Sequence, residues 1–253
     1  MPLISESLDW LLPHKCDICG DVANVTADDI PGYKDLYERL YHEQPGLNIC
    51  KRCLSQLLPL EGVRGWSLCL SNPYDGDPYP ELALFAPFPY DDLCERAMPA
   101  IKFRRKKEIA RLFGVILGKK IKENGICCDL VAPIPLSKKR LEERGFNQAL
   151  EFAIPVAYAT GSPLAEDLLE RTLNTGRQTE CKDNESRFLN VKGAFRMSDE
   201  WDIAGSTVVL VDDVATTGAT LHEAAGAILD NGAGKVLCIA FASNRTVKNA
   251  ETV

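Results

Sequence analysis

The chain has 253 residues, of which 45% are hydrophobic, 26% charged and 8% aromatic, and its formal net charge is −7. This composition excludes disordered and collagen-like architectures, and the length allows one large domain and one small module. No hydrophobic run approaches the roughly 18 residues that a membrane helix needs. Residues 1–13 lack the basic start and hydrophobic block of a secretion signal. We therefore expect a cytoplasmic protein that does not insert into membranes.

Residues 1–61 are the expected small module, because they combine turn-forming residues with two Cys-x-x-Cys pairs. Each pair can present two thiolates to one ion, and four thiolates make a closed tetrahedral zinc site with a structural role. Ten cysteines in a chain without an export signal favour a metal site over a disulfide framework. The alternatives are that His14 or His42 replaces one ligand, or that the thiols are simply buried. The four predicted zinc ligands are Cys16, Cys19, Cys50 and Cys53.

The rest of the chain is predicted to form a linker followed by an α/β domain. We expect residues 62–89 to form a linker with short strands and residues 90–253 to form the larger domain. In this domain, helices are expected at 106–122, 147–160 and 221–229, and strands at 130–135, 208–211 and 236–242. Pro155 is expected to bend or end its helix. The last strand, helix and strand form a βαβ unit, so the sheet should be mostly parallel with flanking helices.

Positive charge is concentrated in residues 96–144, which hold fourteen Lys or Arg and five Asp or Glu, although the chain is acidic overall. Near the start of this segment, four basic residues surround Phe103, and such a run can hold single-stranded DNA through phosphate contacts and stacking. The solvated start of a helix explains the same residues equally well. The candidate DNA contacts are Lys102, Arg104, Arg105 and Lys106.

The sequence from 208 to 220 places four strand-forming residues, two acids and a hydroxyl-rich loop directly before a helix. The amides of such a loop and the positive end of the helix dipole bind phosphate, and threonine hydroxyls add donors. Because Asp212 and Asp213 would repel a phosphate, we expect them to serve ribose hydroxyls or a magnesium ion. The predicted ligand is therefore a sugar phosphate, and a turn followed by an ordinary helix cap is the alternative. The predicted phosphate loop comprises Ala215, Thr216, Thr217, Gly218, Ala219 and Thr220.

This run resembles the phosphoribosyl pyrophosphate (PRPP) signature of type I phosphoribosyltransferases. With the other motifs, it makes the chain resemble the ComF family of competence-associated proteins over nearly its whole length. The further motifs that carry the resemblance lie at 16–20, 50–53, 133–136, 144–149 and 190–195. Arg171, Thr175 and Gln178 also match a family stretch, whereas Leu173 stands where the family usually has a basic residue.

The resemblance implies a type I phosphoribosyltransferase-like α/β fold with a small zinc-ribbon-like module. It also implies that Asp212 and Asp213 are the catalytic residues near the ribose hydroxyls and their magnesium ion. The loop 215–220 would then wrap the 5′-phosphate, and residues 138–195 would hold a mobile loop or hood over the ligand.

The resemblance also implies that the turn at 133–137 binds the pyrophosphate of the ligand, and polar residues after the turn are further candidates. Guanidinium groups bind pyrophosphate oxygens in a forked geometry, and amides can orient a ligand. A solvated basic face or a helix cap is the alternative for these side chains. The predicted PRPP contacts outside the signature are Pro135, Leu136, Ser137, Arg144 and Gln148.

Two functions fit these features. In the first, the protein binds PRPP with magnesium and transfers the phosphoribosyl group to an unknown acceptor with release of pyrophosphate, in support of DNA uptake. In the second, the PRPP pocket is a non-catalytic sensor, and the zinc module and basic segment bind single-stranded DNA or a protein of the DNA-uptake machinery. A zinc module that serves only folding or docking is a third interpretation.

Overall fold

The computed structural model describes residues 13–57, 66–71, 78–79, 81–172 and 184–244. A mostly parallel sheet lies at its centre, with the strand order β1-β2-β8-β7-β4 and with β3 beside β8. Only the β1–β2 pair is antiparallel among the neighbours in this sheet. The strands are β1 (Trp66–Ser71), β2 (Glu81–Ala86), β3 (Phe88–Pro89), β4 (Leu130–Pro133), β7 (Thr207–Ala215) and β8 (Lys235–Ser243). This arrangement confirms the predicted α/β fold.

The strand β7 lies inside the sheet, between β8 and β4, and its residues from 208 to 211 are apolar on both faces. Val209 and Val211 pack with the helices on one side of the sheet, and Val208 and Leu210 pack with those on the other. All four side chains are completely buried. A continuous run of β-branched and aliphatic residues is what a strand covered by helices on both faces requires.

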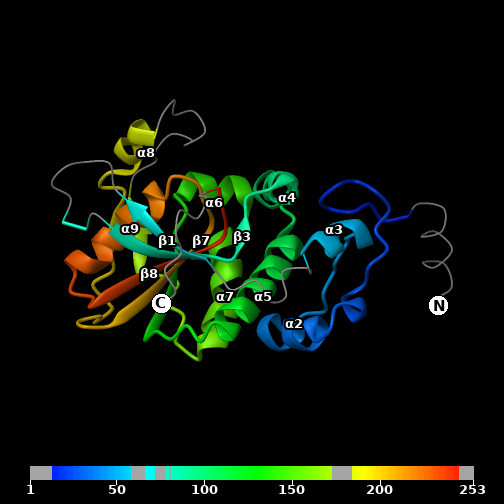
Figure 1. Cartoon of the computed structure of the whole chain (residues 1–253), viewed down its shortest axis with the longest axis horizontal. Coiled ribbons are helices and arrows are strands. Elements are labelled where there is room, and N and C mark those ends of the chain that lie inside the picture. The colour runs from blue at the N-terminus through cyan, green and yellow to red at the C-terminus, as the bar shows by residue number, and fades with distance from the viewer. Residues whose placement is uncertain (1–12, 58–65, 72–77, 80, 173–183, 245–253) are drawn as a thin grey trace.

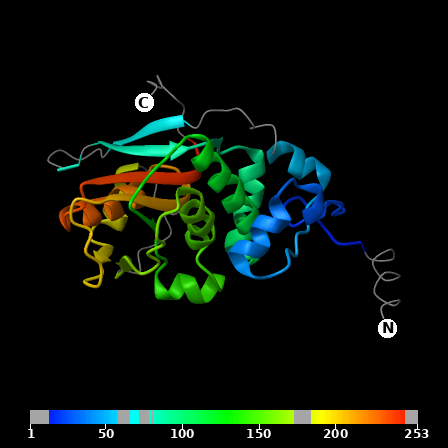
Figure 2. The same ribbon diagram turned by 90° about the horizontal axis from the view of Figure 1, so that it is seen from below.

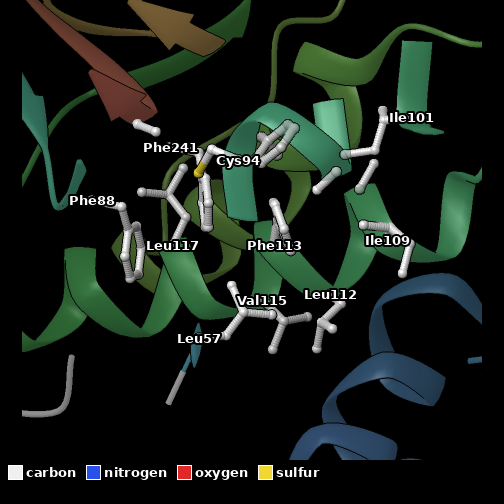
Figure 3. Close-up of a cluster of buried hydrophobic side chains, with 14 of the residues drawn as sticks. Leu57, Phe88, Cys94, Ile101, Ile109, Leu112, Phe113, Val115, Leu117 and Phe241 are labelled. Atoms are coloured by element: carbon white, nitrogen blue, oxygen red, sulfur yellow. The ribbon is translucent and has the colours of Figure 1, made fainter. Parts of the chain in front are cut away.

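Helices cover both faces of the sheet (Figure 1). The helices α5 (Lys107–Glu123) and α7 (Gln148–Thr160) pack on one face, and α9 (Ala219–Asp230) packs on the other. In the core beneath α5, the ring of Phe241 on β8 stacks on Phe88 and Phe113 at centroid distances of 4.4 and 4.3 Å (Figure 3). Aromatic contacts of this kind fix the position of α5 against the sheet.

The helix α7 continues through Pro155 to Thr160, so the proline does not end it. Pro155 is buried and faces Gly118 of α5, where an added Cβ would lie 2.7 Å from the Pro155 carbonyl oxygen. The two helices therefore approach more closely than any side chain at position 118 would allow. The range 138–195, in which the resemblance places a hood, includes this helix of the core.

The cysteine-rich segment packs directly on α5. It contains a 3-10 turn (Ala27–Asp29), α2 (Tyr33–Tyr41) and α3 (Lys51–Leu57). Tyr33, Tyr37 and Leu57 belong to the same hydrophobic cluster as Leu112 and Phe113 of α5. Figure 1 shows α2 and α3 beside α5 at one end of the molecule. The small module and the larger domain therefore share one continuous core.

The segment 62–89, predicted as a linker with short strands, supplies the edge of the main sheet within its described residues. The strand β2 pairs with β8 in parallel register, from Ala83 opposite Leu237 to Phe85 opposite Ile239. Figure 2 shows β1 and β2 continuing the sheet beside β8. These strands contribute to the core rather than only connecting two domains.

The remaining elements are smaller. They are α4 (Asp92–Phe103), α6 (Lys138–Arg144), the antiparallel pair β5 (Leu169–Arg171) and β6 (Phe195–Met197), and α8 (Asn184–Val191). None of the helices among the described residues is long and apolar enough to cross a membrane.

Candidate functional site

A cavity of about 590 Å³ lies where β7 ends and α9 begins. Carboxyl ends of parallel strands are the usual ligand-binding edge of such a sheet. Most of the predicted PRPP contacts line this one cavity, although they are spread along the sequence from Leu136 to Thr220. They are Leu136, Arg144, Gln148, Asp212, Asp213, Ala215, Thr216, Gly218, Ala219 and Thr220.

The phosphate loop leads into α9 through Gly218, whose φ of 79° is in the left-handed region that glycine adopts readily. Thr217 is buried and does not line the cavity, and its Oγ1 accepts a hydrogen bond from the Ala219 amide at 3.4 Å. The first turn of α9 carries no acidic residue. No acid on the helix itself therefore offsets the positive end of the helix dipole, which lies at the cavity.

The acid pair lies in the last part of β7. Asp213 is 6% exposed, and its backbone amide donates to Asp212 Oδ1 at 2.8 Å. Burial, together with the neighbouring charge of Asp213, raises the pKa of Asp212 to about 7, although Lys102 acts in the opposite direction. Lys102 Nζ lies 2.7 Å from Asp213 Oδ2. The two carboxylates thus form a crowded anionic pair on the cavity wall, partly compensated by one lysine.

The turn after β4 is held by hydrogen bonds to helix starts. Ser137 is the N-cap of α6, and its Oγ accepts from the Arg140 amide at 3.4 Å. Asn147 is the N-cap of α7, and its Nδ2 donates to the Ile134 carbonyl at 3.0 Å. Ser137 and Pro135 are not among the residues that line the cavity, whereas Leu136 is. Ser137 therefore has an observed role in shaping the turn.

Gln148 and Arg144 act as a pair. Gln148 is 1% exposed and lines the cavity, and its Oε1 accepts from Arg144 Nη1 at 2.6 Å. Asn147, and not Gln148, caps the helix α7. Gln148 is instead positioned to orient Arg144 toward a ligand.

Three further arginines line the cavity: Arg140, Arg171 and Arg187. Burial, then the positive charges of Arg140 and Arg144, lower the pKa of Arg171 to about 10. A bound polyanion would offset the electrostatic repulsion among these clustered guanidinium groups. Arg171 lies in the matched stretch named above, whereas nothing in the local sequence distinguished Arg187. Thr175 and Gln178 of that stretch lie outside the described residues.

Most of the predicted DNA-contacting residues make intramolecular contacts. Lys102 reaches the acid pair, and Lys106 Nζ lies 2.8 Å from Asp17 Oδ1. The Arg105 Nη2 atom donates to the carbonyl of Glu143 at 3.0 Å. Arg104 is exposed. A DNA contact through this run stays a prediction, and the structure gives Lys102 a place inside the cavity.

The four predicted cysteine ligands come together. The sulfur atoms of Cys16, Cys19, Cys50 and Cys53 all lie within 4.8 Å of one another. The Cys19 and Cys50 sulfurs are 3.6 Å apart, close to the ~3.8 Å expected between thiolates on one tetrahedral zinc ion. Neither His14 nor His42 belongs to this cluster. Burial raises the pKa of the Cys53 thiol, and backbone hydrogen bonds lower that of Cys16 against the effect of burial. The donor set fits a structural metal.

The comparison with known proteins agrees with this geometry. Residues 148–251 match the family described as a phosphoribosyl transferase domain. The chain is 31% identical over 173 residues to the DNA utilization protein YhgH of Escherichia coli (strain K12), covering 66% of this chain and 73% of that protein. It is 34% identical over 148 residues to the competence protein ComFC of Bacillus subtilis, covering 57% of each chain.

A third relative, YhgH of Salmonella typhi, is 33% identical over 141 residues. This match covers 54% of the present chain and 61% of the relative, so the chain spans less than two thirds of that protein. Three observations agree: the order of the motifs, the single cavity that the motif residues line together, and the sequence identity across most of the Escherichia coli relative. The chain belongs to the ComF family of phosphoribosyltransferase-like proteins.

Proposed function

We propose that the cavity binds PRPP together with magnesium. The observation that carries this proposal is the joint lining of one cavity by an acid pair, a phosphate loop at a helix start and four arginines. The loop suits the 5′-phosphate, the acid pair suits the ribose hydroxyl side, and the arginines suit the pyrophosphate. A ligand with a phosphate at one end and a pyrophosphate at the other satisfies all three groups.

The chemistry that we propose is transfer of the phosphoribosyl group to an acceptor, with pyrophosphate as the leaving group. Magnesium, when bound with the ligand, would neutralise charge on the pyrophosphate. The residues of this chain bind and orient the ligand, and Arg144, Arg171 and Arg187 stabilise the negative charge that develops on the departing pyrophosphate. No side chain has to act as a nucleophile in this scheme.

The experiment is calorimetric titration of the full chain with PRPP and magnesium. We expect ribose 5-phosphate to bind more weakly than PRPP, because it lacks the pyrophosphate that the arginines contact. Asp213→Asn should weaken the binding of both ligands. Release of pyrophosphate in the presence of PRPP and a panel of bases and amines should report turnover. Absence of PRPP binding to the wild-type protein would refute the proposal.

A second function is a non-catalytic PRPP sensor that also binds single-stranded DNA or a DNA-uptake protein. The names of the relatives, DNA utilization protein and competence protein, support a DNA-related role. The exposed Phe103, with 64% of its surface accessible beside Arg104, supports a stacking contact. Salt-dependent retention of single-stranded DNA without pyrophosphate release would favour this function.

We further propose that the four-cysteine cluster binds zinc and stabilises the small module, and that the protein acts in the cytoplasm. Four thiol donors favour zinc or iron, and a closed site of this kind has a structural role. Elemental analysis of the purified protein would test the assignment. One zinc per chain in the wild type, and none in Cys53→Ser, is the expected result.

A further inference from the structure

Lys102 holds the position at the acid pair that a cation would take. Its Nζ atom lies 2.7 Å from Asp213 Oδ2, and the two side chains are 24% and 9% exposed. Both residues line the cavity. A positive charge of the chain itself therefore contacts the carboxylate that we assign to the ribose side of the ligand.

The segment around Lys102 is fixed at both ends. Asp91 caps α4 by accepting from the amides of Leu93 and Cys94, each at 3.1 Å. Ile101, next to Lys102, is fully buried in the core. Beyond the helix, Arg105 donates to the carbonyl of Glu143. The direction in which Lys102 leaves the helix is thus set by packing, and its contact with Asp213 follows from the fold.

A divalent cation bound to the same carboxylate would be close to this lysine. Magnesium binds carboxylate oxygens at about 2.1 Å, which places it within about 5 Å of the Lys102 ammonium. Like charges at that separation repel strongly where water is partly excluded. The neighbouring guanidinium groups of Arg140, Arg144 and Arg171 line the same cavity and add to the repulsion. A pyrophosphate would cancel this repulsion, because it brings several negative charges.

We propose that Lys102 is a positioning residue that holds the acid pair and excludes a free divalent cation, so that a divalent cation enters only together with the anionic ligand. The exclusion of free metal rests on the Lys102–Asp213 ion pair and the positive charge around it, and it does not require the proposed PRPP function. Entry of the metal with the ligand rests on the proposed PRPP function.

The first experiment titrates the zinc-loaded full chain with Mn²⁺ alone, followed by electron paramagnetic resonance. We compare the wild type with Lys102→Met and with Lys122→Met, which removes an equal charge from the exposed end of α5. Lys102→Met should bind Mn²⁺ at least tenfold more tightly than the other two, and adding Asp213→Asn should abolish the gain. Lys102→Arg should restore the exclusion, which a purely structural role of the side chain would not predict.

Equal Mn²⁺ affinity of the wild type and Lys102→Met would overturn the proposal, as would a gain that survives Asp213→Asn. Equal thermal unfolding of Lys102→Met and Lys122→Met shows that the comparison concerns folded protein, and Lys102→Gln serves in its place if Lys102→Met unfolds.

The second experiment repeats the titration with PRPP present. The wild type should now bind Mn²⁺ at least tenfold more tightly than without PRPP. Binding of PRPP by the wild type with no gain in Mn²⁺ affinity would overturn the coupling of metal to ligand. If the wild type binds no PRPP while Lys102→Met still gains Mn²⁺ affinity, the proposed function fails and the exclusion by Lys102 stands.

Discussion

Arg111 of α5 and Glu151 of α7 form a buried ion pair, with 3.0 Å between Nε and Oε2 and side chains that are each 5% exposed. The same guanidinium contacts Tyr37 of α2 and lies 2.8 Å from Glu43 Oε2. Tyr41 of α2 donates to the Glu151 carbonyl at 3.2 Å. The cysteine-rich module is thus connected to the first turn of α7, the turn that also carries Gln148.

Glu151→Gln should destabilise the protein strongly, because it leaves the Arg111 charge buried with less compensation. Breaking a buried pair from one side costs about 3 kcal/mol, and urea unfolding would measure the change in the free energy of unfolding. The matched control is Arg196→Met, which removes a surface pair with side chains 73% and 52% exposed. It should cost less than about 1 kcal/mol. Equal effects of the two substitutions would contradict the assignment.

Asp212→Asn should stabilise the protein increasingly as the pH rises. The folded-state pKa of Asp212 is raised to about 7, so folding is favoured when this carboxyl is protonated, and that contribution is lost as the pH rises from about 4 to about 7. The asparagine does not titrate and keeps the oxygen that accepts from the Asp213 amide. Urea unfolding from about pH 4.5 to about pH 8.5 should show an advantage that reaches about 2 kcal/mol. A difference that is constant with pH would contradict the raised pKa.

Gly118→Ala should destabilise the contact between α5 and α7. The added Cβ would lie 2.7 Å from the Pro155 carbonyl oxygen, so backbone has to shift. Overpacking of this kind costs about 2 kcal/mol in thermal or urea unfolding. Gly226→Ala in α9 is the control, because its Cβ would meet Tyr79 only at 3.9 Å. Alanine favours a helix over glycine by up to about 1 kcal/mol, so this control should be neutral or stabilising.

Arg171→Met should weaken PRPP binding about tenfold, because a guanidinium that contacts a pyrophosphate contributes on the order of 1.4 kcal/mol. Methionine keeps much of the apolar contact that Arg171 makes over the Phe195 ring, 5.2 Å from its centroid. Calorimetry should show a smaller effect on ribose 5-phosphate, which carries no pyrophosphate. Arg196→Met, on the neighbouring strand β6 and outside the cavity, should leave both affinities unchanged.

Removal of the metal that we assign to the cysteine cluster should loosen the small module before the sheet. In hydrogen exchange after chelation, amides of α2 and α3 should exchange at least tenfold faster, because the thiol cluster joins the segments that carry them. The β7 and β8 amides should keep their protection, since their strands are held by the main core. Uniform loss of protection throughout the chain would instead show that the module is needed for the whole fold.

Local sequence patterns predicted the features that depend on neighbouring residues. The cysteine spacing predicted the thiol cluster, and the run from Val208 to Thr220 predicted a buried strand, an acid pair and a loop that starts a helix. These patterns allow prediction because their geometry is local. A Cys-x-x-Cys turn or a strand-loop-helix unit positions its own side chains.

Contacts between residues that are far apart in the sequence depend on the tertiary fold. It brought Lys102 of α4 to Asp213 and placed Arg187 of α8 in the same cavity, and it packed the small module on α5 through Arg111. The segment 62–89 became the edge of the sheet through its pairing with β8. None of these contacts has a local signal, because each depends on how the crossover connections and helix packing bring separate segments together.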